Sequence, residues 1–179
     1  MAYLTLLSDK AVVVLTQPLC KAMSDSLLTL DANDDVNVIV LSGNSKSFAA
    51  GADISQLNEF TTKKIILEDY FEHEWNRVLP KTVKPIIALV KGVCFGGGFE
   101  LAMMCDMIFA NEEAKFSLPE ISLGIIPSSG GTVRFTRAVG KYKAMEYILT
   151  GKQMTAKEAE EMGIVNKVWP SQSIDSEVT

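Results

Sequence analysis

Apolar, β-branched runs alternate along the chain with segments of helical pattern, and this alternation limits the possible folds more strongly than any other feature. Strands are expected at residues 11–15, 36–42, 85–90, 107–110, 114–117 and 165–169. Helices are expected at residues 23–30, 61–79, 99–105, 132–149 and 155–163. The longer strands are nearly continuous in apolar residues, as in sheets that are covered on both faces. The pattern predicts an α/β fold with a covered parallel sheet.

The size of the chain, 179 residues, corresponds to about one domain. A content of 47% hydrophobic and 22% charged residues is typical of a globular protein and argues against disorder. The sequence contains no internal repeat and no interdomain linker. Residues 1–170 are therefore expected to form one core, and the polar segment 171–179 is a candidate for disorder.

Charge and hydropathy narrow the partners. Seventeen basic and 22 acidic residues give a net charge of -5, which disfavours a nucleic-acid-binding surface. No apolar run approaches the ~18 residues of a membrane span. Residues 1–5 lack the basic-then-apolar layout of a secretory signal. We expect a soluble intracellular protein with no nucleic-acid partner and no membrane span.

The cysteines and the histidine offer little chemistry. Cys20, Cys94 and Cys105 are odd in number and widely spaced, without a C-x-x-C pair, so buried thiols are expected rather than disulfides or a metal site. The single histidine, His73, lies among acidic residues and is expected on the surface, away from any nucleophile. Carboxylates and backbone amides remain as the candidate chemical groups.

Three consecutive glycines at residues 96–98 stand directly before a predicted helix. They would bare the free N–H groups of its first turn, at the positive end of the helix dipole, where a developing negative oxygen is stabilised. The alternative is that the glycines only permit close packing of the helix on a strand. On the motif alone the two interpretations are equally supported.

Two carboxylates lie in apolar surroundings. Glu100 falls in the first turn after the glycines, and Glu120 follows between Pro119 and Ile121. Apolar surroundings raise the pKa of a carboxyl, so one of the pair can hold a proton while the other accepts one. This division suits the addition of water to a double bond and also glycoside hydrolysis, and spacing does not decide between them.

Four ordered motifs, at residues 49–54, 96–106, 118–127 and 130–140, resemble the enoyl-CoA hydratase/isomerase (crotonase) superfamily, and its hydratases in particular. The resemblance extends from Val12 to Trp169. It implies a crotonase-like spiral of ββα units, assembly as a homotrimer or a dimer of trimers, and fatty-acid metabolism in the cytoplasm or the mitochondrial matrix. It also implies an acyl-CoA thioester as the substrate, with coenzyme A as part of that substrate and no separate cofactor or metal.

The resemblance also implies roles for individual residues. The N–H groups of Ala52 and Gly97 would form an oxyanion hole for the thioester carbonyl. Glu100 would activate water for attack on the β-carbon of a trans-2-enoyl-CoA, and Glu120 would protonate the α-carbon. The residues expected to bind the substrate or coenzyme A are Ala50, Gly51, Asp53, Ile54, Gly96, Gly98, Pro127 and Ser128.

Three features depart from the family pattern. The connection between Pro18 and Val36 is short, and Lys21 there could replace a lost phosphate contact or simply be solvated. Ser128 stands where hydratases often have glycine. The chain ends soon after Trp169, so a C-terminal helical cap is expected to be missing. These departures keep open another acyl-CoA enzyme of the superfamily, such as a Δ3-Δ2 enoyl-CoA isomerase, and also a non-catalytic or truncated CoA-binding paralogue.

Overall fold

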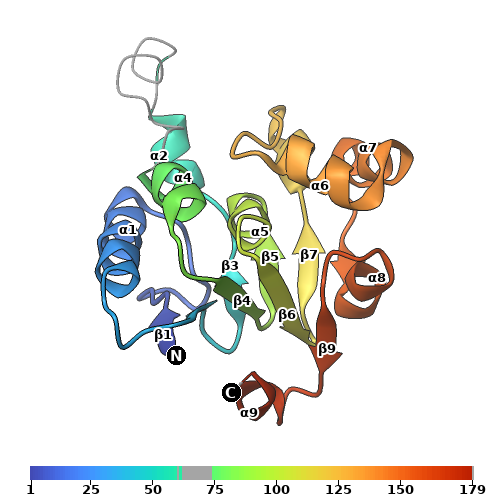
Figure 1. Ribbon diagram of the computed structural model, residues 1–179. Helices are drawn as coiled ribbons and strands as arrows, with labels where there is room; N and C mark the ends of the chain where they lie inside the picture. Colours follow the sequence, from blue (N-terminus) through green and yellow to red (C-terminus); the bar gives the residue numbers. More distant parts are fainter. Residues whose placement is uncertain (60, 62–73, 179) are drawn as a thin grey trace.

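The computed structural model describes residues 1–59, 61 and 74–178, and it contains two sheets (Figure 1). The first has the order β1 (Ala2–Thr5), β2 (Ile39–Ser42), β4 (Ile86–Val90), β6 (Met107–Asn111) and β9 (Lys167–Trp169), all parallel. The second has the order β3 (Ser47–Ala49), β5 (Val93–Phe95), β7 (Lys115–Ser117) and β8 (Met154–Thr155). β8 pairs antiparallel to β7, and the other neighbours are parallel. The predicted α/β fold is confirmed.

The chain gives its strands alternately to the two sheets. β2, β4 and β6 enter the first sheet, and β3, β5 and β7 enter the second directly after them. Helices α2 (Ile54–Asn58) and α5 (Gly97–Ala102) follow β3 and β5, and helix α6 (Gly131–Val139) follows β7 after a longer connection. Two strands, one in each sheet, and the helix that follows them thus form a ββα unit, and such units repeat along the chain, as the predicted spiral requires.

The remaining helices surround these units. They are α1 (Gln17–Asp31), α4 (Glu74–Val78), α7 (Lys141–Thr150), α8 (Ala156–Glu161) and α9 (Ile174–Glu177), with 3-10 turns η1 (Leu79–Lys81) and η2 (Pro119–Leu123). A capping box begins α8, because Thr155 and Glu158 exchange hydrogen bonds between side chain and backbone there. Within the part of the chain that the structure describes, every helix is too short or too polar to cross a membrane.

Aromatic rings connect the central helix to the second sheet and to α6. Phe99 of α5 is fully buried, with ring centroids 5.2 Å from Phe116 and 5.8 Å from Phe135. Such tilted and edge-on pairs stabilise a core beyond the area that they bury. Phe99 is therefore a core residue. Figure 1 shows α5 at the centre of the fold, between α4 and α6.

The strand predicted at residues 11–15 is wrong. The position beside β2 is taken by β1, whose Ala2 pairs with Ile39, and residues 11–15 run along the loop that follows β3 instead. There Leu15 forms an isolated parallel bridge with Ala52, and the Val13 carbonyl accepts a bond from Ala50 N–H. Val13 and Leu15 of this run are buried, and the run pairs with the loop rather than with a sheet strand.

The single helix predicted at residues 132–149 is two helices, α6 and α7. Gly140 lies between them with a φ of 79°. This left-handed value ends α6, and only glycine adopts it without steric cost.

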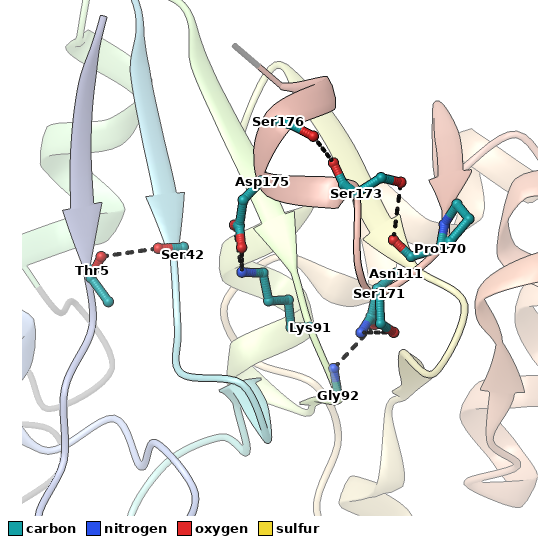
Figure 2. A network of polar contacts seen from close by, with 10 residues as sticks. All are labelled: Thr5, Ser42, Lys91, Gly92, Asn111, Pro170, Ser171, Ser173, Asp175 and Ser176. Atoms are coloured by element: carbon teal, nitrogen blue, oxygen red, sulfur yellow. Dashed lines mark hydrogen bonds and ion pairs between the residues drawn. The ribbon is translucent and has the colours of Figure 1, made fainter.

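Residues 171–178, which belong to the polar segment considered for disorder, include the helix α9. Figure 2 shows it beside the first sheet, where Lys91 Nζ donates to Asp175 Oδ2 at 2.6 Å and Asn111 Nδ2 to Ser171 Oγ at 2.9 Å. Ile174 is fully buried and Val178 nearly so, in a cluster with residues of the first sheet. These two apolar positions, four residues apart, share one helical face and anchor an otherwise polar segment.

Candidate active site

The turn between β5 and α5 creates the start of the site. Gly96 has a φ of 52°, which turns the chain from Phe95 at the end of β5 into the helix that begins at Gly97. A β-carbon added to Gly98 would lie 2.2 Å from the Ala49 carbonyl oxygen. The glycine motif therefore serves packing at Gly98, which presses α5 onto β3, and this contact sets the position of Gly97.

A cavity of about 180 Å³ opens in front of this turn. It is lined by Leu15, Ala50, Gly51, Ala52, Ile54, Leu57, Trp75, Gly96, Gly97, Glu100, Pro119, Glu120, Ser122, Leu123, Ser128 and Ser129. The lining combines apolar side chains with two carboxylates and backbone amides, as small-molecule sites commonly do.

Two backbone N–H groups meet at one wall of the cavity. A β-carbon added to Gly97 would lie 3.9 Å from the Ala52 nitrogen, and one added to Gly51 would lie 3.5 Å from the Gly97 nitrogen. Neither Ala52 N–H nor Gly97 N–H donates to an acceptor among the residues that the structure describes. Two free donors this close can bind a single carbonyl oxygen and stabilise negative charge on it.

Glu100 is 2% exposed and firmly held. Its Oε1 accepts hydrogen bonds of 2.7 Å from both Ser129 N–H and Gly131 N–H, the latter at the start of α6. Burial raises the pKa of Glu100, while these two N–H groups and the Arg134 guanidinium act in the opposite direction. The carboxylate is thus oriented by the backbone, with its charged form supported from the side of α6.

Glu120, in η2, lies in surroundings that disfavour its charged form. Its Oε2 is buried, with no hydrogen-bond partner among residues 1–59, 61 and 74–178. Burial, with a smaller contribution from the negative charge of Glu100, raises the pKa of Glu120 to about 7. A carboxyl with this pKa can carry a proton near neutral pH and release it, as general acid catalysis requires. Glu120 Oε2 thus lacks the backbone donors that hold Glu100 Oε1.

The other predicted binding residues fall into two groups. One group lines the cavity together with the two N–H donors and the two carboxylates. This group consists of Ala50, Gly51, Ile54, Gly96 and Ser128.

Asp53, Gly98 and Pro127 are not among the residues that line the cavity. Asp53 accepts a bond from Ser55 N–H at the start of α2, and it also pairs with Lys10. Pro127 is buried, and a β-carbon added to Gly131 would lie 3.0 Å from it.

Several lining residues were not predicted from the sequence. Leu15 and Leu57 are apolar residues that any core could use, and Ser129 contributes a backbone N–H, which no side-chain pattern reveals. Trp75 is 1% exposed and belongs to the main hydrophobic core, yet it also lines the cavity.

Residues considered for other chemistry lie apart from the cavity or outside the described chain. Lys21 is exposed and pairs with Asp25, in agreement with a solvated lysine. Cys20 and Cys94 are buried free thiols, while Cys105 is partly buried. His73, expected on the surface, lies outside the described residues. Among the residues that are described, no three His, Cys, Asp or Glu side chains are grouped so that they could hold a metal ion.

Comparison with known proteins decides the family. A family model described as enoyl-CoA hydratase/isomerase matches residues 1–179. The chain belongs to this family. A crystal structure of an enoyl-CoA hydratase subunit I from Geobacillus kaustophilus superposes with a TM-score of 0.94 at 38% identity, covering 98% of this chain and 68% of the other. The crotonase-like spiral predicted from the resemblance is confirmed.

Curated members of the family are similar along nearly the whole chain. A protein named "Probable enoyl-CoA hydratase, mitochondrial" from Dictyostelium discoideum is 45% identical over 98% of this chain. The mitochondrial enoyl-CoA hydratase of Pongo abelii is 42% identical over 94% of it. The chain spans 62% and 57% of the lengths of these two relatives.

Proposed function

We propose that this chain catalyses the syn addition of water to trans-2-enoyl-CoA thioesters, giving 3-hydroxyacyl-CoA, as in fatty-acid β-oxidation. The observation that carries this proposal is the meeting of two carboxylates and two free N–H donors in one cavity. The donors suit a thioester oxygen, and the carboxylates suit the two proton transfers of a hydration.

In the proposed reaction, Ala52 N–H and Gly97 N–H bind the thioester oxygen and polarise the conjugated double bond. Glu100 takes a proton from water as the water oxygen bonds to the β-carbon. Electrons move onto the thioester oxygen as an enolate, and Glu120 then gives its proton to the α-carbon. The elements of one water molecule are added, and coenzyme A stays part of the substrate, so no further cofactor is needed.

The presence of both carboxylates favours hydration over the alternatives. A Δ3-Δ2 isomerase moves one proton between two carbons and can do so with a single carboxylate, whereas hydration also requires activation of water. Glu100, held by two backbone N–H groups at 2.7 Å, is oriented for that second task.

The test is hydration of but-2-enoyl-CoA, followed by the loss of ultraviolet absorbance of the conjugated thioester. We expect turnover by the unmodified chain, and a loss of ~10²-fold or more in Glu100→Gln and in Glu120→Gln, because each loses a general acid or base. Glu161→Gln, on the exposed side of α8, is the matched control and should keep full activity.

Binding of butyryl-CoA, measured by calorimetry, separates failed chemistry from failed binding and should survive in both variants. Near-normal turnover by Glu120→Gln would contradict the assigned roles. Turnover of but-3-enoyl-CoA without hydration would favour the isomerase, and binding without any turnover would favour a non-catalytic paralogue.

The assembly and the compartment are part of the proposal. We propose a homotrimer or a dimer of trimers, which sedimentation of the purified chain would test. The reaction suits the mitochondrial matrix or a bacterial cytoplasm, where acyl-CoA thioesters are metabolised.

A further inference from the structure

Arg134 contacts the same short segment, residues 129–131, that holds Glu100. The Arg134 Nη1 donates to the Ser129 carbonyl at 3.1 Å. Glu100 accepts from the N–H of that same Ser129 and from the N–H of Gly131. The segment 129–131 is therefore bound by the carboxylate through its N–H groups and by the guanidinium through a carbonyl.

The guanidinium also takes the place of a side chain at residue 130. Gly130 has a φ of 96°, and a β-carbon added to it would lie 1.9 Å from Arg134 Nη1. A left-handed glycine is conformationally free in the absence of contacts, because it has no side chain to restrict it. The packing of Arg134 against Gly130 supplies that restriction.

The charges around Glu100 give the contact a second effect. Among the described residues, the charged groups that face this carboxyl are Arg134 and Glu120, and they act in opposite senses. Arg134 favours the ionised form of Glu100, as does the positive N-terminal end of α6, while Glu120 disfavours it when ionised. Loss of Arg134 would leave the unfavourable burial of Glu100 less compensated.

We propose that Arg134 is a positioning residue, which holds the segment 129–131 so that its two N–H groups orient Glu100 toward the cavity. Arg134 lies outside the cavity lining and acts through the segment and not on the substrate. As a statement about catalysis, this inference rests on the proposed function. As a statement about the state of Glu100, it stands independently.

The experiment compares Arg134→Gln with Arg134→Lys and with Arg137→Gln, a control one turn further along α6 whose side chain is exposed. For Arg134→Gln we expect kcat for but-2-enoyl-CoA hydration to fall roughly tenfold, with KM changed less than about twofold, because a misoriented base slows chemistry more than binding. Arg134→Lys, which keeps the charge but not the planar fork, should recover part of the rate.

The acid limb of the kcat profile should also move to higher pH in Arg134→Gln. Combined with Glu100→Gln, Arg134→Gln should cause little further loss, because residues that act through one group are not additive. Equal losses in Arg134→Gln and Arg137→Gln, or a full additional loss in the Glu100→Gln background, would overturn the proposal.

A measurement without turnover separates this inference from the proposed function. Carbon NMR of labelled glutamate carboxyls, with the Glu100 signal identified by Glu100→Gln, should show Glu100 titrating at higher pH in Arg134→Gln and unchanged in Arg137→Gln. An unchanged Glu100 titration in Arg134→Gln refutes the positioning role, whether or not the chain hydrates enoyl thioesters. If Arg134→Gln does not fold, the same titration in Arg134→Lys decides, with a partial movement expected and no movement contradictory.

Discussion

Replacing Glu120 with glutamine should stabilise the protein above neutral pH. The ionised carboxylate is buried, and within the described part of the chain its Oε2 has no hydrogen-bond partner. Burial raises the pKa of Glu120 from 4.5 to about 7 in the folded state. The folded protein thus binds this proton more tightly than the unfolded chain does, so the associated stability is fully present below pH 4.5 and is lost as the pH rises through 7.

The size of the effect follows from the two pKa values. A difference between 4.5 and about 7 corresponds to roughly 3 kcal/mol, at about 1.4 kcal/mol per pH unit. Glu120 is only half-buried as a residue, so solvent screens its charge, and we expect about 1–2 kcal/mol. Glutamine resembles the protonated carboxyl and carries no charge, so its contribution does not change with pH. The substitution also removes the repulsion between the charges of Glu120 and Glu100, which adds to the stability of the variant at high pH.

The assay is urea unfolding of the unmodified chain and of Glu120→Gln, at several values between pH 5 and pH 9. The variant should be equal in stability near pH 5 and more stable by about 1–2 kcal/mol near pH 8.5, whereas Glu161→Gln should follow the unmodified chain throughout. A constant difference across the whole range would refute the reasoning that the raised pKa of Glu120 destabilises the folded protein at high pH.

Two further predictions test packing. Gly97→Ala meets only ordinary contacts, 3.7 Å or more, and should melt near the temperature of the unmodified chain. It should nevertheless lose ~10²-fold or more in hydration, about the effect of losing one oxyanion donor, because the added methyl lies 3.9 Å from the Ala52 nitrogen, in the space proposed for the thioester oxygen. Gly98→Ala, 2.2 Å from a backbone oxygen, should lose about 2–3 kcal/mol in unfolding free energy, and equal melting of the two variants would contradict this division. Ile174→Ala should lower the free energy of unfolding by about 2–4 kcal/mol, because the side chain is fully buried. Lys91→Ala should lower it by less than about 1 kcal/mol, because its partner Asp175 is largely exposed. The reverse order would show that charge and not burial holds α9.

The candidate carboxylates and the glycine turn can be predicted from the sequence, because residue type alone indicates their chemistry. Glu100 and Glu120 are carboxylates among apolar residues, and the glycines at 96–98 mark the turn into α5, so both features were visible before the fold was known. The motif left packing and oxyanion binding equally supported. In the structure the glycines of the motif have different surroundings: Gly98 packs against Ala49, while Gly97 lines the cavity.

What the sequence did not reveal depends on contacts between distant residues. β3 and β5 have three residues each and form a second sheet through pairings about 46 positions apart, such as Ser47 with Val93, which no local pattern encodes. The N–H groups of Ser129 and Gly131 hold Glu100 whatever their side chains are, so residue type gives no signal for them. The apolar run at residues 11–15 is typical of a strand, but β1 occupies the place beside β2 in the first sheet.

The most direct test of the central claim is to carry out the reaction in deuterium oxide and to identify the product of but-2-enoyl-CoA by mass spectrometry and NMR. We predict 3-hydroxybutyryl-CoA with one deuterium at the α-carbon and the new hydroxyl at the β-carbon, formed by the unmodified chain and not by Glu120→Gln. Exchange of protons or migration of the double bond without addition of water by the unmodified chain would contradict it.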